Sequence, residues 1–279
     1  MPISSCHNPP LCNLLPFWRP TVSKLKVPYG SVAKPPSTSA DAPATLPPMI
    51  RFALFCVLLA MPARADFVQN NLRITLYHEV GHAVIDLVPV NLFGPEENAA
   101  DSFALVLADR LHSEEEMAQI VTDMTTLGRV EARREVFDPW AEYMPGAQRL
   151  ASAICLYYGL NPDTRRTKAV ALGMPLQKAA NCRDYGRTVR AGWSAVLDSL
   201  APSAPGSATL KAGRTGKAMR LLQPDIDRVN AHIALPKAVP VNAEACDQDN
   251  AFYYHYDDHI VICHEMVDAL RGYVRARRQ

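Results

Sequence analysis

Three features that mark common classes of protein are missing from this sequence of 279 residues. Lys and Arg number 29 against 28 Asp and Glu, so the chain lacks the domain-wide positive charge of nucleic-acid-binding proteins. The apolar run from Phe52 to Met61 is too short to span a membrane, which takes about 20 residues. None of the seven cysteines belongs to a C-x-x-C pair, the spacing of thiolate zinc knuckles and redox motifs. We therefore expect no nucleic-acid partner, no stable membrane span and no thiolate metal site.

The first 65 residues show no sign of belonging to a folded domain. Residues 1–48 are rich in Pro, Ser and Ala and sustain no apolar period, so we expect them to be disordered. Arg51, the short apolar run and Ala63-Arg64-Ala65 then form the pattern of a secretory signal peptide. Because Met49 precedes this pattern, we expect translation to start there, with residues 1–48 a gene-model artefact and residues 49–65 the signal peptide. The alternatives are an internal hydrophobic patch and an uncleaved anchor.

Export would leave one domain, residues 66–279, in the periplasm or outside the cell. Four cysteines then remain in an oxidising compartment, where disulfides persist. They are Cys155, Cys182, Cys246 and Cys263. Order along the chain suggests that the first two pair and the last two pair, although four cysteines allow three connectivities.

Residues 77–83, Y-H-E-V-G-H-A, carry the most specific chemical pattern. Residues four apart share one face of a helix, so His78 and His82 can bind the same metal ion. Glu79 follows the first histidine, where its carboxylate can reach a metal-bound water without being a ligand. This is the H-E-x-x-H arrangement of zinc hydrolases. The alternative for the two histidines alone is that they are surface residues, and no histidine follows at the metzincin spacing, where Val88 stands.

Apolar residues at spacings of three and four predict that residues 67–87 form the helix that carries this motif. A second predicted helix, from Glu96 to about His112, offers a third ligand. The two helices are joined by a short turn and should pack together, which brings the start of the second near the histidines. Glu97 is the candidate ligand, and Asp101, one turn later on the same face, would accept the free N–H of a ligand histidine. Glu96 is the rival ligand. In the simplest alternative these carboxylates merely stabilise the positive end of the helix dipole.

The other elements predict an α+β fold that is mainly helical, with a small C-terminal β-hairpin or sheet. Apolar periods predict further helices over about 113–127, 147–158 and 181–200, followed by a loop or linker over 201–217. Residues 234–241, 251–256 and 259–263 read as strands, with a helix starting at His264. His264-Glu265 and Asp268 superficially repeat the first motif, and we interpret them as the start of that helix rather than a second metal site.

The chain resembles a family of exported bacterial metallopeptidases of unknown substrate, which are similar to gluzincin-type zincins. This resemblance implies a zincin-like metallopeptidase domain with His78, His82 and Glu97 as zinc ligands and Glu79 as the base. The chain departs from the family pattern at Tyr143 and His264, where relatives tend to carry histidine and tyrosine. The matching segments are residues 76–86, 96–101, 148–149, 155–162, 250–253 and 260–265.

These observations predict a zinc-dependent peptidase in which Glu79 activates a zinc-held water against a peptide or protein substrate. Two alternatives remain: an exported zinc-binding or scaffold protein without turnover, and an amidase of cell-wall peptides. A side chain that stabilises the oxyanion is also expected, and the sequence does not choose among its candidates. The candidates are Tyr143, Tyr157, Tyr253 and His255.

Overall fold

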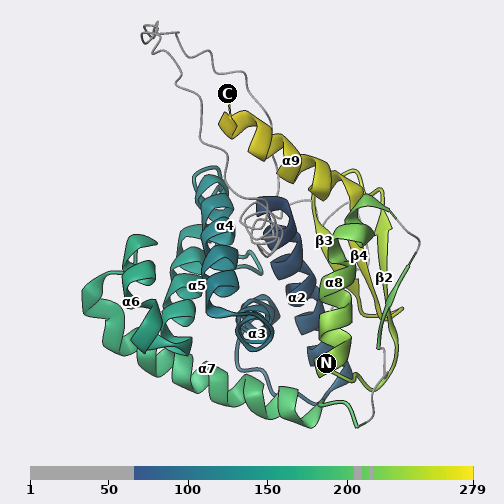
Figure 1. Cartoon of the computed structure of the whole chain (residues 1–279), viewed down its shortest axis with the longest axis horizontal. Helices are drawn as coiled ribbons and strands as arrows, with labels where there is room; N and C mark the ends of the chain where they lie inside the picture. The colour runs from purple at the N-terminus through teal and green to yellow at the C-terminus, as the bar shows by residue number, and fades with distance from the viewer. Residues whose placement is uncertain (1–65, 204–208, 214–215, 279) are drawn as a thin grey trace, which may run out of the picture. The chain divides into compact units, whose positions relative to one another are not determined.

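The long helix α2 (Phe67–Leu87) lies between a group of helices and a sheet (Figure 1). The computed structural model describes residues 66–203, 209–213 and 216–278. The predicted upstream extension, residues 1–48, and the predicted signal peptide, residues 49–65, lie outside the described residues. Among those that are described, no helix is both long and apolar enough to cross a membrane.

Helix α2 has the bounds that its apolar spacing predicts, and the chain explains both ends. The Asp66 side chain accepts a hydrogen bond of 2.9 Å from the backbone N–H of Gln69, the usual form of an N-cap. The helix ends at Leu87, two residues before a proline that cannot continue it. Buried side chains lie all around α2 and include polar ones such as Arg73, which donates to Asp225 at 2.6 Å. This helix is therefore central, and its histidine face looks into the protein.

Helices α3 (Glu96–Leu111) and α4 (Glu114–Ala132) cover one side of α2, and α5 (Gly146–Leu160) packs against both of them. Ser113 and Glu116 cap α4 reciprocally, as the sequence predicts, but the helix extends five residues beyond the expected end near Leu127. The approach of α3 to α2 depends on Gly81. A Cβ atom there would lie 3.1 Å from the Cα of Ala100, closer than ordinary van der Waals contact.

The next helices form a second layer: α6 (Pro162–Ala171), the short 3₁₀ helix η2 (Leu176–Lys178) and α7 (Ala179–Ser199). Helix α6 is not predicted from the sequence, because Asn161-Pro162 was interpreted only as the end of the helix that became α5. Proline is favoured in the first turn of a helix, and Pro162 occupies that place. Helix α7 packs along α5, to which the disulfide between Cys155 and Cys182 joins it.

The sheet is larger than the predicted hairpin and has the strand order β1-β2-β4-β3. Strands β1, β2 and β4 are parallel, whereas β3 pairs antiparallel with β4 at one edge. Strand β1 lies within the predicted linker 201–217, and helix α8 was not predicted. A disulfide joins Cys246 to Cys263. The elements are β1 (Leu210–Ala212), α8 (Lys217–His232), β2 (Val239–Glu244), β3 (Ala251–Tyr254), β4 (His259–Cys263) and α9 (His264–Arg278). The predicted mainly helical α+β class is thus correct, and so are both predicted cysteine pairs.

Candidate metal centre

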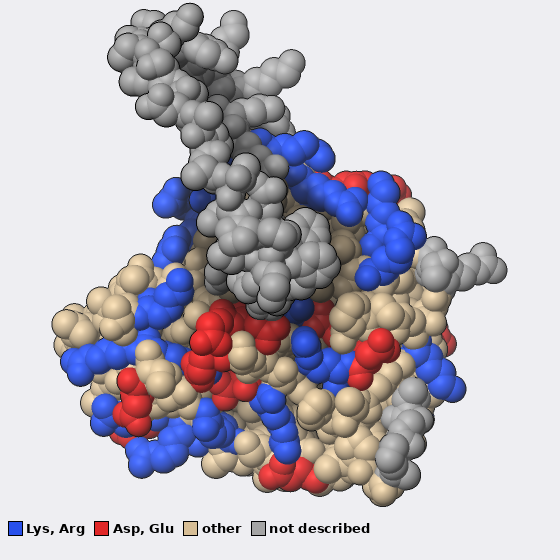
Figure 2. All heavy atoms as spheres, viewed as in Figure 1, with Lys and Arg blue, Asp and Glu red and all other residues tan. Residues whose placement is uncertain are grey.

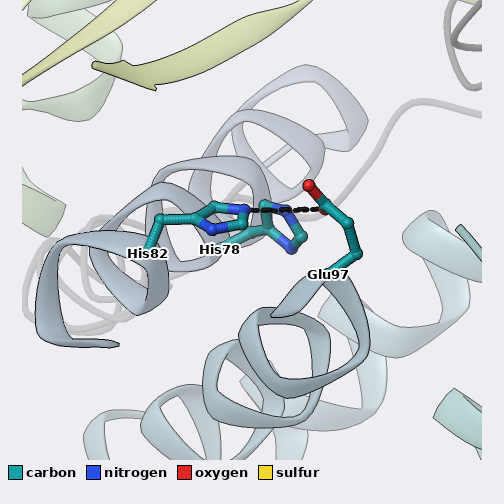
Figure 3. Close-up of side chains that lie close together, drawn as sticks. All are labelled: His78, His82 and Glu97. Carbon is teal, nitrogen blue, oxygen red and sulfur yellow. Dashed lines mark hydrogen bonds and ion pairs between the residues drawn. The ribbon is translucent and has the colours of Figure 1, made fainter. Parts of the chain in front are cut away.

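Two imidazole rings from α2 and one carboxylate from α3 meet at the centre of the helical layer (Figure 3). The Nε2 atoms of His78 and His82 are 3.1 Å apart. The Oε2 atom of Glu97 lies 3.1 Å from Nε2 of His78 and 3.5 Å from Nε2 of His82. Both histidines are buried, with 8% of their surface exposed. The structure therefore brings the three predicted ligands together with their ligand atoms facing one point.

The distances among these three atoms suit a metal ion. An ion about 2 Å from each ligand atom of a tetrahedral site would hold those atoms about 3.3 Å apart. The observed separations, 3.1, 3.1 and 3.5 Å, bracket that value. Two imidazole lone pairs and a carboxylate at such range repel one another unless a proton or a metal ion lies between them. His78, His82 and Glu97 are accordingly a group that could hold a metal ion.

Each histidine is oriented by a second carboxylate on its other ring nitrogen. The Nδ1 atom of His82 lies 2.7 Å from Oε1 of Glu96. The Nδ1 atom of His78 lies 2.9 Å from Oδ1 of Asp101. Carboxylates at Nδ1 favour the tautomer whose Nε2 lone pair is free for a metal. Asp101 contacts His78, as the sequence predicts. Glu96, which was expected only as a rival ligand, contacts Nδ1 of His82, the ring nitrogen that faces away from the other ligands.

The sequence analysis gave no role to Arg149, which holds Asp101 in place. Its guanidinium donates two hydrogen bonds to the Asp101 carboxylate, from Nε to Oδ2 and from Nη2 to Oδ1. It also stacks on the Tyr143 ring, 4.5 Å from the ring centre. Residues 148–149 form one segment of the family resemblance, and that was the only signal of their importance. The contacts continue from His78 through Asp101 to Arg149 on α5.

The acidic side chains around the histidines favour positive charge at the centre. Burial alone would lower the pKa of His82, but hydrogen bonds to Glu96 and Glu97 raise it to about 10. Burial would raise the pKa of Glu97, but its hydrogen bonds to both histidines hold that pKa well below its usual range. The pKa of Asp101 is also lowered, because Arg149 and His78 outweigh its burial. These carboxylates therefore favour positive charge at the centre, whether it is carried by a proton or by a metal ion.

Glu79 lies beside the ligand group without belonging to it. Its side chain is buried, and burial raises the pKa of its carboxyl group despite the nearby histidines. The carboxylate accepts a hydrogen bond from the backbone N–H of Tyr253 in β3. Glu79 therefore lies between the candidate metal centre and the edge strand of the sheet.

Two of the four candidate oxyanion donors lie near this centre. Tyr143 hydrogen-bonds Glu97, and the His255 ring is 6.5 Å from the His82 ring. The Tyr253 hydroxyl donates instead to Asp86 and Asp258, at 3.0 and 3.1 Å. Tyr157 stacks under Arg165, in a different part of the helical layer.

The partial repeat of the motif at His264, Glu265 and Asp268 has a structural explanation. Helix α9 begins at His264, and its Glu265 carboxylate accepts backbone N–H groups of Cys246 and Asp247 at 3.0 to 3.2 Å. Cys246, Cys263 and Glu265 are close enough together to hold a metal ion. However, the two sulfurs are bonded to each other, so they are not thiolate ligands.

Replacing Arg149 by Met should lower the metal affinity of the centre by roughly 10- to 100-fold, the usual effect of removing an outer partner of a ligand. The change leaves the Asp101 carboxylate buried without its cation and releases His78. Competition with a chromophoric chelator would measure the affinity. Arg149→Lys keeps the charge but loses the planar fork, so its affinity should fall between that of wild type and that of Arg149→Met. Arg187→Met, which breaks an exposed pair with Asp184, is the control. Equal affinity in all four proteins would contradict this role.

Comparison with known proteins agrees with the geometry of the centre. Over residues 13–197 and 214–279, the chain matches the family described as "Putative metallopeptidase". No curated protein and no solved structure matches it. Because the match covers most of the sequence and includes both helices of the candidate metal centre, the chain belongs to the "Putative metallopeptidase" family.

Proposed function

We propose that this protein is a zinc-dependent peptidase. The observation that carries the proposal is the convergence of His78, His82 and Glu97 on one point with Glu79 beside them. Two imidazoles and a carboxylate form a known ligand set of catalytic zinc, and three protein ligands leave a position for water. Zinc held there would acidify that water and polarise the carbonyl group of the substrate.

The residues of the chain would supply the proton transfers. Glu79 accepts a proton from the attacking water and delivers it to the leaving amine. Asp101 and Glu96 keep the histidine rings oriented, and Arg149 holds Asp101. Tyr143 lies beside Glu97 and the His255 ring lies 6.5 Å from the His82 ring, so either could donate a hydrogen bond to the oxyanion.

Strand β3 offers a place for an extended peptide. The carbonyl of Asn250 accepts a hydrogen bond of 3.0 Å from the backbone N–H of Cys263, so the backbone groups of Asn250 point toward β4. Backbone groups alternate in direction along a strand, so those of Ala251 and Tyr253 point to the outer edge. The contact from Tyr253 N–H to Glu79 agrees with this direction. A substrate strand added at this edge would lie next to the general base.

We also infer that the protein is exported. The disulfides Cys155–Cys182 and Cys246–Cys263 support this inference, because disulfides persist in oxidising compartments.

A peptide-library digest combined with zinc analysis tests the function. We expect about one zinc ion per chain, cleavage of library peptides, loss of cleavage with a chelator and its return with zinc. Zinc without cleavage would favour a binding or scaffold protein, and cleavage confined to cell-wall peptides would favour an amidase. Absence of zinc from protein purified with zinc present would contradict the metal site.

Two neighbouring glutamates provide a matched test of the ligand set. Glu97→Gln should weaken zinc binding by more than about a hundredfold, because it removes a ligand rather than an outer partner. Glu96→Gln keeps an oxygen that can accept from His82 Nδ1 and loses only the negative charge, so we expect a smaller loss, of at most roughly 10- to 100-fold. Calorimetric titration with zinc would compare the two. A larger loss in Glu96→Gln would show that Glu96 is the ligand.

A further inference from the structure

A pocket of about 100 Å³ opens beside the candidate metal centre. His78 and Glu79 form part of its wall. From His78 it extends along one face of α2 through Thr75 to Asn71, about 10 Å by the rise of a helix. The remaining wall comes mainly from apolar side chains of α2 to α5. These include Ile74, Leu105, Met124, Leu127, Leu150 and Ala153.

Glu131, near the end of α4, is an acidic group in this otherwise mainly apolar wall. It is 9% exposed, and its Oε2 atom has no hydrogen-bond partner within the described part of the chain. Burial raises the pKa of Glu131 well above its usual range, Asp249 raises it further, and Arg149 and Arg134 lower it. A buried carboxyl group without a full set of partners is unfavourable, so a hydrogen-bond donor that reaches Glu131 through the pocket would stabilise it.

The nearest cation of the wall does not meet this need. Arg149 lines the same pocket, but two of its hydrogen bonds go to the Asp101 carboxylate, which balances its charge. Asp249 adds a second carboxylate near Glu131. On the surface, Figure 2 shows acidic side chains near the middle of one face of the molecule, with Lys and Arg around them. Around the pocket, the two carboxylates of Glu131 and Asp249, beside an arginine already paired with Asp101, favour a cationic ligand.

We propose that this pocket binds a lysine or arginine side chain of the substrate, with Glu131 as the specificity-determining residue. The inference rests on the proposed peptidase function, and it names the class of residue that lies next to the cleaved bond. The apolar walls contact the methylene stem of such a side chain, and Glu131 accepts hydrogen bonds from its charged head. The length of the pocket along α2 suits a long, narrow side chain.

Matched peptides test the proposal. Once a library digest has located the cleaved bond, the residue on each side of it is varied between arginine and citrulline, and between lysine and norleucine. Arginine and citrulline differ in charge and very little in shape, whereas norleucine lacks both the charge and the terminal nitrogen of lysine. We expect kcat/KM of the wild-type protein to be roughly tenfold or more higher for the charged member at one of the two positions. In Glu131→Gln this preference should disappear, whereas in Glu115→Gln, an exposed change on the same helix, it should remain. Glu131→Met serves as a second variant, and circular dichroism checks that each variant folds.

A binding experiment separates failure of this proposal from failure of the peptidase function. Butylguanidinium and its neutral analogue butylurea are titrated into the zinc-loaded wild-type protein and into Glu131→Gln, with ligand-observed NMR as the readout. Tighter binding of butylguanidinium, lost in Glu131→Gln, supports the pocket even if no peptide is cleaved. Cleavage without a preference for Lys or Arg, or equal binding of the two probes, overturns the proposal.

Discussion

Glu79→Gln should lower kcat for a cleaved peptide by roughly 10²- to 10⁴-fold while the protein keeps its zinc. The substitution removes the group that takes the proton from water but changes the size of the side chain very little. The amide oxygen of the introduced glutamine can still accept the backbone N–H of Tyr253, so α2 and β3 should remain in place. Because Glu79 does not belong to the ligand group, the zinc affinity should stay near that of wild type.

The measurements are single-peptide kinetics and zinc content on the same preparation. Glu115→Gln, an exposed change of the same kind on α4, should retain full activity and full zinc. Undiminished hydrolysis by Glu79→Gln would rule out Glu79 as the base. Loss of zinc from this variant would show instead that Glu79 binds the metal.

The parts of the site that the sequence predicted are those governed by local geometry. Spacing along a helix places His78 and His82 on one face whatever surrounds them. The short connection between α2 and α3 makes their packing predictable, and with it the arrival of Glu97 and Asp101 near the histidines. These four residues meet in the structure as the sequence analysis expected.

The parts that the sequence did not predict depend on contacts between distant segments. Arg149 reaches Asp101 across 48 residues of sequence, and no local pattern distinguishes this arginine from an exposed one. Glu131 is another example, because an acidic residue near the end of a helix usually faces solvent. The pocket in which it lies is formed by four helices together, so it becomes visible only after they pack.

The sheet shows the same limit. Strand β1 has only three residues, and its parallel pairing with β2 spans the whole of α8. Parallel pairs require a crossover connection, so nothing near residues 210–212 indicates a strand. The antiparallel pair β3 and β4 is joined by a short turn, and it was predicted. Helix α8 contains Pro224, which weakens a helical reading of its sequence.

Gly159→Ala should destabilise the protein by about 3 kcal/mol or more, at the upper end of the effect of overpacking. A Cβ atom at Gly159 would lie 2.1 Å from the carbonyl oxygen of Cys182 and 2.8 Å from the Cα of Gly186. Both are backbone atoms, so relief requires α5 and α7 to move apart. The disulfide one helical turn away opposes this movement, since it holds the Cα atoms of Cys155 and Cys182 at 4.9 Å.

Gly192→Ala, on the exposed side of the same helix α7, is the matched control. Among the residues that the structure describes, no atom beyond the adjacent part of α7 lies within 4 Å of a Cβ added at this position, so the change should stabilise the helix by about 0.5 to 1 kcal/mol. Thermal unfolding should therefore shift down by roughly 6 to 12 °C in Gly159→Ala, but slightly up in Gly192→Ala. Because α5 also carries Arg149, displacement of α5 should weaken zinc binding in Gly159→Ala alone. Equal melting temperatures for the two variants would show that α5 and α7 do not pack through Gly159 and Gly186.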